Sequence, residues 1–490
     1  MKYKTHILFL VLFLTLISGC KKKNIIEDDE PFQTNTLTDL LVYPTSMSFE
    51  YVGLPEKQQI TVKTVPEDAS DVSFAWSSTN NSVAGVSETG LVTVTGIGEA
   101  QITVTANEQI TKKVQVTVKE FRSPGAFRSP VYLQNPATDG MSVYWLTYAP
   151  SHSWVEYGTD SLDMQQRAQT VDDGLILANN TANRIRLTGL TPGTRYFYRA
   201  CSRQVLVYEP YNKVFGATLK GKISSFTTLD NEKTDFTALI FNDLHSEFNR
   251  PELIGKLLQQ VKDVPYDIVF FNGDCFADVR TELEAIKFLS IFTQAIGGDS
   301  IPSVFVRGNH ELRGAYSLHL YSLLGKAGGE EHYGAFNIGD TRFVILDFGE
   351  DKPDDDPVYG GLNDFSQFRK DMADFTRKEK ASEAFLSAAR RVLIHHIPLY
   401  VNLGQNTSWN DYRVEWQGIF ANVPFDISIN GHIHVCRHYP KNSSGNDFPI
   451  VTGGGPNESN ATVLLLRKQG AQMTLTALNV AGETLLSLNL

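Results

Sequence analysis

Five apolar segments beyond residue 234 each end close to a histidine, aspartate or asparagine, and this pattern restricts the possible folds more than any other feature. The segments are 236–242, 266–272, 301–306, 391–394 and 425–430, and the residues after them include Asp243, Asp274, Asn309, His395 and His432. Amphipathic stretches such as 250–261 and 281–297 separate them, as is typical of strands that alternate with helices. Parallel strands end at one edge of a sheet, where α/β proteins bind their ligands. We therefore predict that these polar side chains lie together.

The chemical character of these side chains indicates a cation. Imidazoles and carboxylates fixed near one another would repel or lack hydrogen bonds unless a metal ion held them. Such ligands suit iron, zinc or manganese better than calcium. Each residue alone has a simpler explanation: Asp243 could form a turn, Asn309 could cap a helix and His395 could be a hydrogen-bonded core histidine. Five such residues at successive strand ends favour a metal site.

The chain ahead of residue 234 is predicted to form two β-sandwiches. Residues 40–119 contain short alternating runs such as 58–65 and 100–106. The stretch that begins at Trp76, with the strand-like runs after it, resembles the bacterial Ig-like family. A spacer is the simpler role for this domain, and contact with a cell-surface glycan or protein is the alternative. Residues 124–229 form the second predicted sandwich, in which the segment ending at Tyr196 resembles the tyrosine corner of Ig and fibronectin type III-like folds.

The ordered motifs after residue 234 resemble the calcineurin-like metallophosphoesterases. Together with the preceding sandwich they resemble the purple acid phosphatases, and this resemblance extends from residue 124 to the C-terminus. It implies that residues 234–490 form an α/β domain of four layers, with two facing mixed sheets flanked by helices. The expected fold is therefore multidomain, with two N-terminal β-sandwiches followed by the metallophosphoesterase domain.

The resemblance also implies a site that holds two metal ions. The ligands implied for the first metal are Asp243, His245, Asp274 and His434, and those implied for the second are Asp274, Asn309, His395 and His432. A carboxylate such as that of Asp274 can bridge two cations because it has an oxygen atom for each. His310 is the expected catalytic residue that stabilises developing charge or protonates the leaving group. Glu311 is expected to orient a neighbouring group.

The implied activity is that of a metal-dependent phosphoric ester hydrolase. In that family, hydroxide held by the metals attacks phosphorus, and phosphate monoesters are the expected substrates. The alternative is a phosphodiesterase that acts on nucleotides or glycerophosphodiesters. An alternative of another class is a surface protein that binds a glycan or host molecule and keeps a vestigial metal site. The formal net charge of -11 argues against a nucleic-acid partner.

The sequence departs from the purple enzymes in several places. Ala277 stands where they have a tyrosinate ligand, and His245 stands where they have glycine, so we expect no purple charge-transfer band. Their additional histidines beyond the fourth motif are also missing, and substrate contacts cannot be transferred. Tyr400, Asn402 and Asn406 are the candidate substrate-binding residues there.

The first 20 residues have the pattern of a bacterial lipoprotein signal peptide. Two lysines precede an apolar run too short to span a bilayer, and the run ends in a segment that resembles a lipobox, with Cys20 as the lipidated residue. Residues 21–39 are suited to a flexible tether. The expected location is the bacterial cell envelope, with the protein anchored to the membrane on the periplasmic face or the cell surface.

Overall fold

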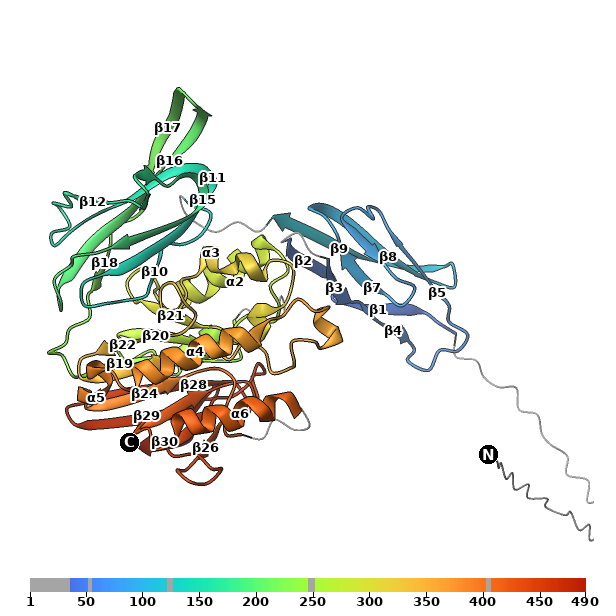
Figure 1. Cartoon of the computed structure of the whole chain (residues 1–490). Coiled ribbons are helices and arrows are strands. Elements are labelled where there is room, and N and C mark those ends of the chain that lie inside the picture. Colours follow the sequence, from blue (N-terminus) through green and yellow to red (C-terminus); the bar gives the residue numbers. More distant parts are fainter. Residues whose placement is uncertain (1–35, 52–54, 121–126, 246–251, 402–406) are drawn as a thin grey trace, which may run out of the picture.

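The structure is a computed structural model that describes residues 36–51, 55–120, 127–245, 252–401 and 407–490, except for the side chains of residues 407–411. Two β-sandwiches precede a larger α/β domain, which confirms the expected order of folds (Figure 1). Among these described residues, no helix has the length and apolar character needed to span a bilayer.

The first sandwich is built from nine strands. They are β1 (Asp39–Tyr43), β2 (Ser46–Tyr51), β3 (Glu56–Gln59), β4 (Thr61–Val65), β5 (Phe74–Ser78), β6 (Ala84–Val86), β7 (Leu91–Val94), β8 (Gly98–Ala106) and β9 (Ile110–Glu120). The strand orders are β2-β9-β8-β5 and β3-β7-β6, with β1 paired to β4. Along β8, Ala100, Ile102 and Val104 point into the core while the residues between them are partly exposed, which is the alternation of a half-buried strand.

The second sandwich includes a long, bent strand and a protruding hairpin. Its strands are β10 (Tyr132–Gln134), β11 (Met141–Gly158), β12 (Gln166–Ala168), β13 (Val171–Asp172), β14 (Leu175–Ile176), β15 (Ala178–Leu187), β16 (Arg195–Glu209), β17 (Asn212–Lys220) and β18 (Ser224–Thr227). The backbone N–H of Thr191 donates to the Tyr196 hydroxyl at 3.0 Å, so the predicted tyrosine corner is present. The hairpin of β16 and β17 extends away from the α/β domain (Figure 1).

The α/β domain contains two mixed sheets. The strands of the first are β19 (Phe236–Phe241), β20 (Ile268–Asn272), β21 (Ser303–Val306), β28 (Thr462–Gln469), β29 (Gln472–Asn479) and β30 (Thr484–Asn489). The strands of the second are β22 (Gly334–Ile338), β23 (Thr341–Ile345), β24 (Arg390–Ile394), β25 (Ile427–Asn430), β26 (Arg437–Tyr439) and β27 (Ile450–Thr452). β19, β20 and β21 are parallel to one another, and so are β23, β24, β25 and β27.

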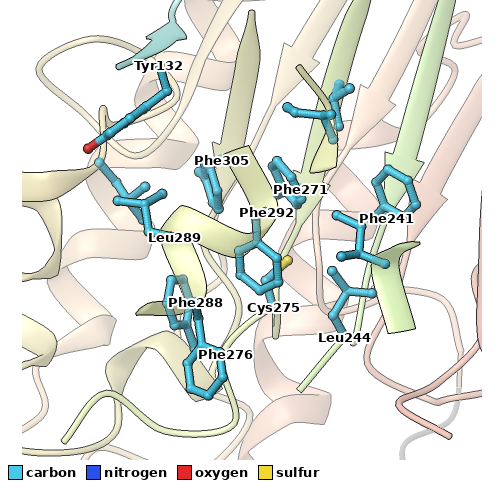
Figure 2. Packing of buried hydrophobic residues seen from close by; sticks show 14 of the residues in the cluster. Tyr132, Phe241, Leu244, Phe271, Cys275, Phe276, Phe288, Leu289, Phe292 and Phe305 are labelled. Atoms are coloured by element: carbon cyan, nitrogen blue, oxygen red, sulfur yellow. The ribbon is translucent and has the colours of Figure 1, made fainter. Parts of the chain in front are cut away.

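Alternating apolar side chains explain why two sheets form and face each other. In β20, Ile268 and Phe270 contribute to the core shared by the two sheets, whereas Val269 and Phe271 contribute to a core on the outer face. That outer core is rich in aromatic rings, and the rings of Phe271 and Phe305 stack with centroids 4.4 Å apart (Figure 2). Because each strand is apolar on both sides, helices must cover the outer faces.

Helices pack on both outer faces and complete the four layers. The helices are α1 (Leu253–Gln259), α2 (Glu282–Ala295), α3 (Leu320–Leu323), α4 (Phe365–Glu379), α5 (Glu383–Ser387) and α6 (Thr407–Phe420), with short 3-10 turns η1 (His310–Leu312), η2 (Ser317–His319) and η3 (Pro357–Tyr359). Side chains of α1, α2 and α3 join the outer core of the first sheet, and those of α4, α5 and α6 join that of the second.

The second sandwich is joined to the α/β domain by strand pairing as well as by side chains. Gln134 of β10 pairs in parallel with Ser303 of β21, so one sheet runs through both domains. The hydroxyl of Tyr198 donates to the carbonyl oxygen of Asp299 at 2.8 Å. This junction fixes the sandwich beside β21, the strand that leads to His310.

Candidate metal centre

The predicted site residues follow the carboxyl ends of parallel strands from both sheets. β19 leads to Asp243 and β20 to Asp274, while β21 leads to Asn309 in the first sheet. In the second sheet, β24 leads to His395 and His396, and β25 leads to His432 and His434. Five of the residues have left-handed backbone angles, which are uncommon for residues other than glycine: Asp243, His245, Asp274, His432 and His434. Such a concentration of unfavourable backbone is found at functional sites.

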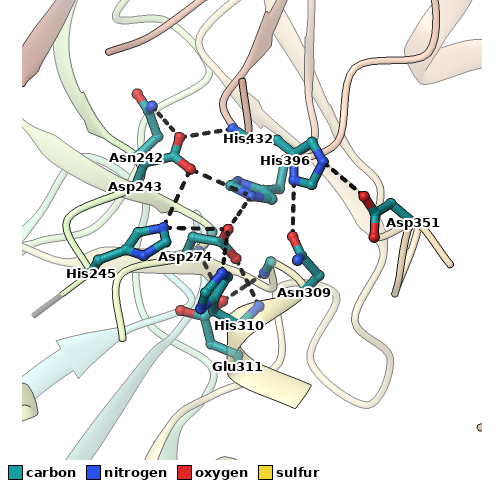
Figure 3. Close-up of polar contacts among 12 residues, drawn as sticks. Asn242, Asp243, His245, Asp274, Asn309, His310, Glu311, Asp351, His396 and His432 are labelled. Carbon is teal, nitrogen blue, oxygen red and sulfur yellow. Dashed lines mark hydrogen bonds and ion pairs between the residues drawn. The ribbon is translucent and has the colours of Figure 1, made fainter. Parts of the chain in front are cut away.

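Asp274 lies at the centre of the cluster (Figure 3). Its Oδ2 is 3.0 Å from Nε2 of His396, 3.6 Å from Nε2 of His245 and 3.9 Å from Nε2 of His310. Its Oδ1 accepts a hydrogen bond from the backbone N–H of His310 at 2.8 Å. Several imidazoles thus share one buried carboxylate.

Asp243 is a second buried carboxylate beside the first. Its Oδ1 lies 3.2 Å from Nε2 of His434 and 3.8 Å from Nε2 of both His245 and His396. Its Oδ2 accepts hydrogen bonds from Asn242 Nδ2 at 2.6 Å and from the backbone N–H of His432 at 2.8 Å. One carboxylate oxygen is therefore fixed by the protein, and the other faces the imidazoles.

His396 occupies the place that the sequence analysis assigned to His395, and that assignment is wrong. His395 is buried on the other side of the strand end, where its ring contacts Phe348 and its Nε2 lies 3.2 Å from the Ser428 hydroxyl. His396 points between the sheets with its Nδ1 2.8 Å from the carbonyl oxygen of Asn272. This contact fixes the ring and leaves Nε2 directed at Asp274, in the way that a backbone carbonyl commonly orients a metal-binding histidine.

Gly273 makes the position of His396 possible. A Cβ atom at residue 273 would lie 2.4 Å from Cγ of His396, and the φ angle of +78° also favours glycine. Alternation along β24 places Val392 and Ile394 in the core between the sheets, and His396 continues the same face. The sequence shows this alternation, but it does not show which side of the strand faces the core between the sheets.

Asn309 and His432 form the other side of the cluster. Nδ1 of His432 lies 3.0 Å from Oδ1 of Asn309, and Nε2 of His432 lies 3.4 Å from Oδ2 of Asp351 (Figure 3). Burial opposes ionisation of Asp351, but hydrogen bonds with His432 and Glu350 lower the pKa of its carboxyl group below the usual range. Asp351 was not among the predicted site residues, because nothing in the sequence of its acidic loop marks one carboxylate as closer to the site.

His310 is oriented by two contacts. Its Nδ1 lies 2.5 Å from the carbonyl oxygen of Ala277, and its Nε2 lies 2.8 Å from Nη1 of Arg313. Since arginine only donates and a carbonyl only accepts, the ring is neutral, with its proton on Nδ1. Burial lowers the pKa of His310, consistent with this neutral state. Ala277, at the position of the family's tyrosinate, thus contributes a backbone carbonyl next to His310.

Glu311 binds the backbone of the loop that carries Asp274. Its two carboxylate oxygens accept four backbone N–H groups at 2.8 to 3.1 Å, from Asp274, Cys275, Phe276 and Gly308. The side chain is almost fully buried. Its expected role in orienting a neighbouring group is therefore performed on the loop backbone, and it makes no contact that assigns it to the reacting atoms.

Replacing Glu311 with glutamine is expected to loosen the whole loop. The amide nitrogen of glutamine would face backbone donors, so we expect a loss of about 2 to 4 kcal/mol of unfolding free energy and a 10- to 100-fold loss of metal affinity. Thermal unfolding and metal titration measure the two effects, with the exposed Glu383→Gln as the control. Unchanged stability together with unchanged metal affinity would contradict this role.

The residues that are present fit a metal centre. Three overlapping groups each have ligand atoms within 4.8 Å of one another: Asp243, His245 and His434; His245, Asp274 and His310; and Asp274, His396 and His432. Oδ1 of Asp243, Nε2 of His245 and Nε2 of His396 are buried and, apart from the ion-pair contacts within the cluster, have no hydrogen-bond partner among the described residues. Buried polar atoms are normally satisfied, so these atoms have the properties of ligands directed at a cation.

When no metal neutralises the buried carboxylates, they favour the protonated form of the neighbouring histidines. Burial disfavours the charged form of each histidine, but the nearby Asp243 and Asp274 carboxylates outweigh it, raising the pKa of His245 to about 9 and that of His396 to about 10. By contrast, burial lowers the pKa of His395 to about 3. Positive charge is therefore held at the centre and not at His395.

Metal uptake at pH 7 is expected to release roughly two protons, because His245 and His396 must lose theirs to become ligands. Calorimetric titrations of the metal-free protein in buffers of different ionisation enthalpy measure this number. A binding enthalpy that does not depend on the buffer would contradict the prediction.

The same two histidines make the stability of the metal-free protein depend on pH. Because both folded-state pKa values are raised, the stabilising contribution of these histidines is complete below about pH 6.5 and is lost as the pH rises through about 9 to 10.

The candidate substrate residues and the lipidation site have different outcomes. Tyr400 is buried and packs edge-on against Phe448 in the outer core of the second sheet, so it is not a substrate contact, and that prediction is wrong. Asn402, Asn406 and Cys20 lie outside the described residues. Apolar packing explains the position of Tyr400, because Leu399 and Phe448 belong to the same outer core.

Comparisons with known proteins agree with this organisation. Residues 236–436 match the family described as Calcineurin-like phosphoesterase. Residues 128–218 match the Purple acid Phosphatase, N-terminal domain, and residues 55–118 match the Bacterial Ig-like domain (group 2). The matches follow one another in the order in which the three folded regions occur.

One curated relative and two solved structures extend the comparison. "Acid phosphatase type 7" of Mus musculus is 27% identical over 195 residues, which are 38% of this chain and 40% of that protein. The chain thus matches about two fifths of that relative's length. Purple acid phosphatase PPD1 from seeds of yellow lupin (Lupinus luteus) has a TM-score of 0.54 at 14% identity, covering 92% of this chain and 95% of its own. The structure of PhoD has a TM-score of 0.51 at 11% identity, covering 75% and 90%.

The two solved structures show the fold, and the matches to family descriptions identify the domains. The strand ends that bear Asp243, Asp274 and Asn309 fall inside the 236–436 match, as do those that bear His396 and His432. Three successive regions of the chain therefore match a bacterial Ig-like domain, a purple acid phosphatase N-terminal domain and a calcineurin-like phosphoesterase domain.

Proposed function

We propose that this protein is a metal-dependent phosphoric ester hydrolase with two metal ions, and that phosphate monoesters are its substrates. The observation that carries the proposal is the set of three aspartate and histidine groups that overlap through His245 and Asp274, with buried ligand atoms that have no hydrogen-bond partner outside the cluster. The similarity to the calcineurin-like phosphoesterases and to a protein named as an acid phosphatase supports the same reaction class.

The candidate ligands divide between the two sides of Asp274. On one side are Asp243, His245 and His434, and on the other are Asn309, His396 and His432. Metal ions bound there would supply Lewis acidity and activate a water molecule for attack on phosphorus. Iron, zinc and manganese are the metals that suit this mixture of imidazole, carboxylate and amide donors.

The residues around the ligands have separate tasks. Glu311 holds the loop that carries Asp274, and the Asn272 carbonyl holds His396. His310 faces Asp274, and its Nε2 accepts from Arg313. Once Arg313 withdraws and Nε2 takes up a proton from solvent, His310 would be placed to stabilise negative charge or to pass that proton to the leaving group. Asp351 restrains His432.

An assay on two generic substrates tests the proposal. Wild-type protein and His310→Ala are compared on an aryl phosphate and an aryl phosphodiester, after elemental analysis has measured bound metal. Hydrolysis of the monoester that is much weaker in His310→Ala supports the proposal. Preference for the diester would replace the substrate class, and activity on neither substrate with metal fully bound would favour a binding protein.

Export to the bacterial cell envelope and anchoring through a lipid at Cys20 are part of the same proposal. They rest on the lipoprotein-like pattern of the first 20 residues. The full-length chain is expected in the membrane fraction, and Cys20→Ser is expected in the soluble fraction after expression in a bacterial host. Equal membrane association of the two proteins would exclude the anchor.

A further inference from the structure

A cavity next to the metal centre has no role in the proposed chemistry. It has a volume of about 1170 Å³ and is lined by the segment that follows η1, by the turn near residue 330 and by the loop that leads into α4. Two of its lining residues connect it to the centre. Arg313 contacts His310, and Lys352 follows Asp351, which contacts His432.

The cavity wall is suited to a ring system. Phe365 and Phe368 of α4 line it, and the guanidinium of Arg307 lies 5.2 Å from the ring centroid of Phe368. Leu318 and Leu362 at the rim are 92% and 89% exposed. Apolar and aromatic side chains that remain exposed around a cavity mark a binding site for an organic group.

Two polar groups in the wall lack partners. His332 is more than nine-tenths buried, and neither its ring nitrogens nor the Tyr321 hydroxyl makes a hydrogen bond to another described residue. The two rings are nearly perpendicular, with centroids 4.2 Å apart. Burial and the charges of Arg307 and Lys326 lower the pKa of His332 to about 2, so its ring is neutral and can both donate and accept. Both residues line the cavity, so a ligand with hydrogen-bonding edges could bond to the imidazole and the hydroxyl there.

The cationic side chains of the wall already have partners in the protein. Arg307 pairs with Asp347 and Arg313 with Glu350, while Lys352 pairs with Asp351. Lys326 donates to the neutral carbonyl oxygen of Glu330 and shares the wall with the carboxylates of Glu331 and Asp364. The wall and its ion-pair partners therefore carry no net positive charge to attract a second phosphate, and this favours a neutral occupant.

We propose that this cavity binds the leaving group of the substrate, and that the leaving group is a neutral, ring-bearing alcohol of nucleoside size. The inference rests on the proposed function, because the phosphate of such an ester would lie at the metal centre while its ring system enters the cavity. Stacking on the aromatic wall and hydrogen bonds to Tyr321 and His332 would select it over a small alcohol.

Kinetics with two phosphate monoesters of primary alcohols test the inference. Wild-type protein is expected to show at least about a tenfold higher kcat/KM for adenosine 5′-monophosphate than for glycerol 3-phosphate. Tyr321→Phe, which removes only the hydroxyl, is expected to lower kcat/KM for the nucleotide about three- to tenfold, mainly by raising KM, with a smaller effect on glycerol 3-phosphate. Leu318→Glu, a change at an exposed rim position, should act in the same direction.

Matched controls separate the cavity from general damage. Tyr439→Phe makes the same chemical change at a hydroxyl outside the cavity that has no described partner, and Leu162→Glu changes an exposed leucine of the second sandwich. Neither should alter the ratio of the two kcat/KM values. Titration of adenosine into the metal-free protein adds a readout that needs no catalysis, and binding is expected to weaken in Tyr321→Phe.

The outcomes distinguish this inference from the proposed function. If the wild-type protein hydrolyses an aryl phosphate but treats the nucleotide and glycerol 3-phosphate alike, the cavity assignment is overturned while the proposed function stands. If it hydrolyses no monoester, the proposed function fails, and adenosine binding to the metal-free protein still decides whether the cavity takes a nucleoside. Absence of that binding overturns the inference.

Discussion

Asp274→Asn is expected to reduce kcat on a phosphate monoester by about a thousandfold or more and to lower the amount of bound metal. Removing one charge-stabilising group typically costs about 10²- to 10³-fold, and this carboxylate lies within 4 Å of three imidazoles on the two sides of the centre. An amide supplies one neutral oxygen and no negative charge, so it cannot bridge two cations as a carboxylate does. Steady-state kinetics and elemental analysis of the purified variant measure both effects.

The control for this change is Asp278→Asn, four residues further along the same loop. Asp278 is partly buried and belongs to none of the candidate metal groups. It should keep its metal and its activity. An Asp274→Asn protein with two metals and near-normal turnover would show that the ligand assignment is wrong.

His396→Ala is expected to lose activity and metal, whereas His395→Ala is expected to lose stability. The first removes a nitrogen that lies 3.0 Å from Asp274, so kcat should fall at least about a hundredfold with loss of metal. The second removes a buried ring packed against Phe348, so it should cost about 2 to 4 kcal/mol of unfolding free energy while metal content is kept. Thermal unfolding, metal analysis and kinetics on both proteins separate the two histidines.

His395→Gln replaces His395→Ala in this comparison if the alanine variant does not fold. Glutamine retains groups that can hydrogen-bond Ser428 and Asn430, which contact His395 in the structure. Full metal content and activity within about tenfold of wild type are expected. Loss of metal from the His395 variants, with retention in His396→Ala, would restore the original assignment.

Much of the fold follows from local patterns in the sequence. Strands such as β8 alternate between apolar and polar residues and need one buried face, which produces sandwiches. Strands such as β19 and β20 are apolar on both faces and need covering on both sides, which produces the layered α/β domain. The residues at the strand ends could be listed from the sequence because Asp243, Asp274 and Asn309 each follow such a run.

The same local patterns could not provide the absolute orientation of side chains. In the segment 390–396, alternation requires His395 and His396 to point in opposite directions, but both faces of the strand are apolar, and the pattern is the same for either choice. Packing decides it: Val392 and Ile394 join the core between the sheets, Leu393 joins the outer core, and His396 follows the first pair.

The sequence alone determined the order of the domains and the types of donor at the ends of the strands, because hydrophobic alternation and strand ends are local properties. Only the tertiary structure decided which of two adjacent histidines reaches Asp274, that Glu311 holds four backbone N–H groups, and that Asp351 approaches His432. It also decided that segments near residues 313, 332 and 365 enclose one cavity. These are contacts between residues far apart in the chain, and the packing of the two sheets and their loops fixes them.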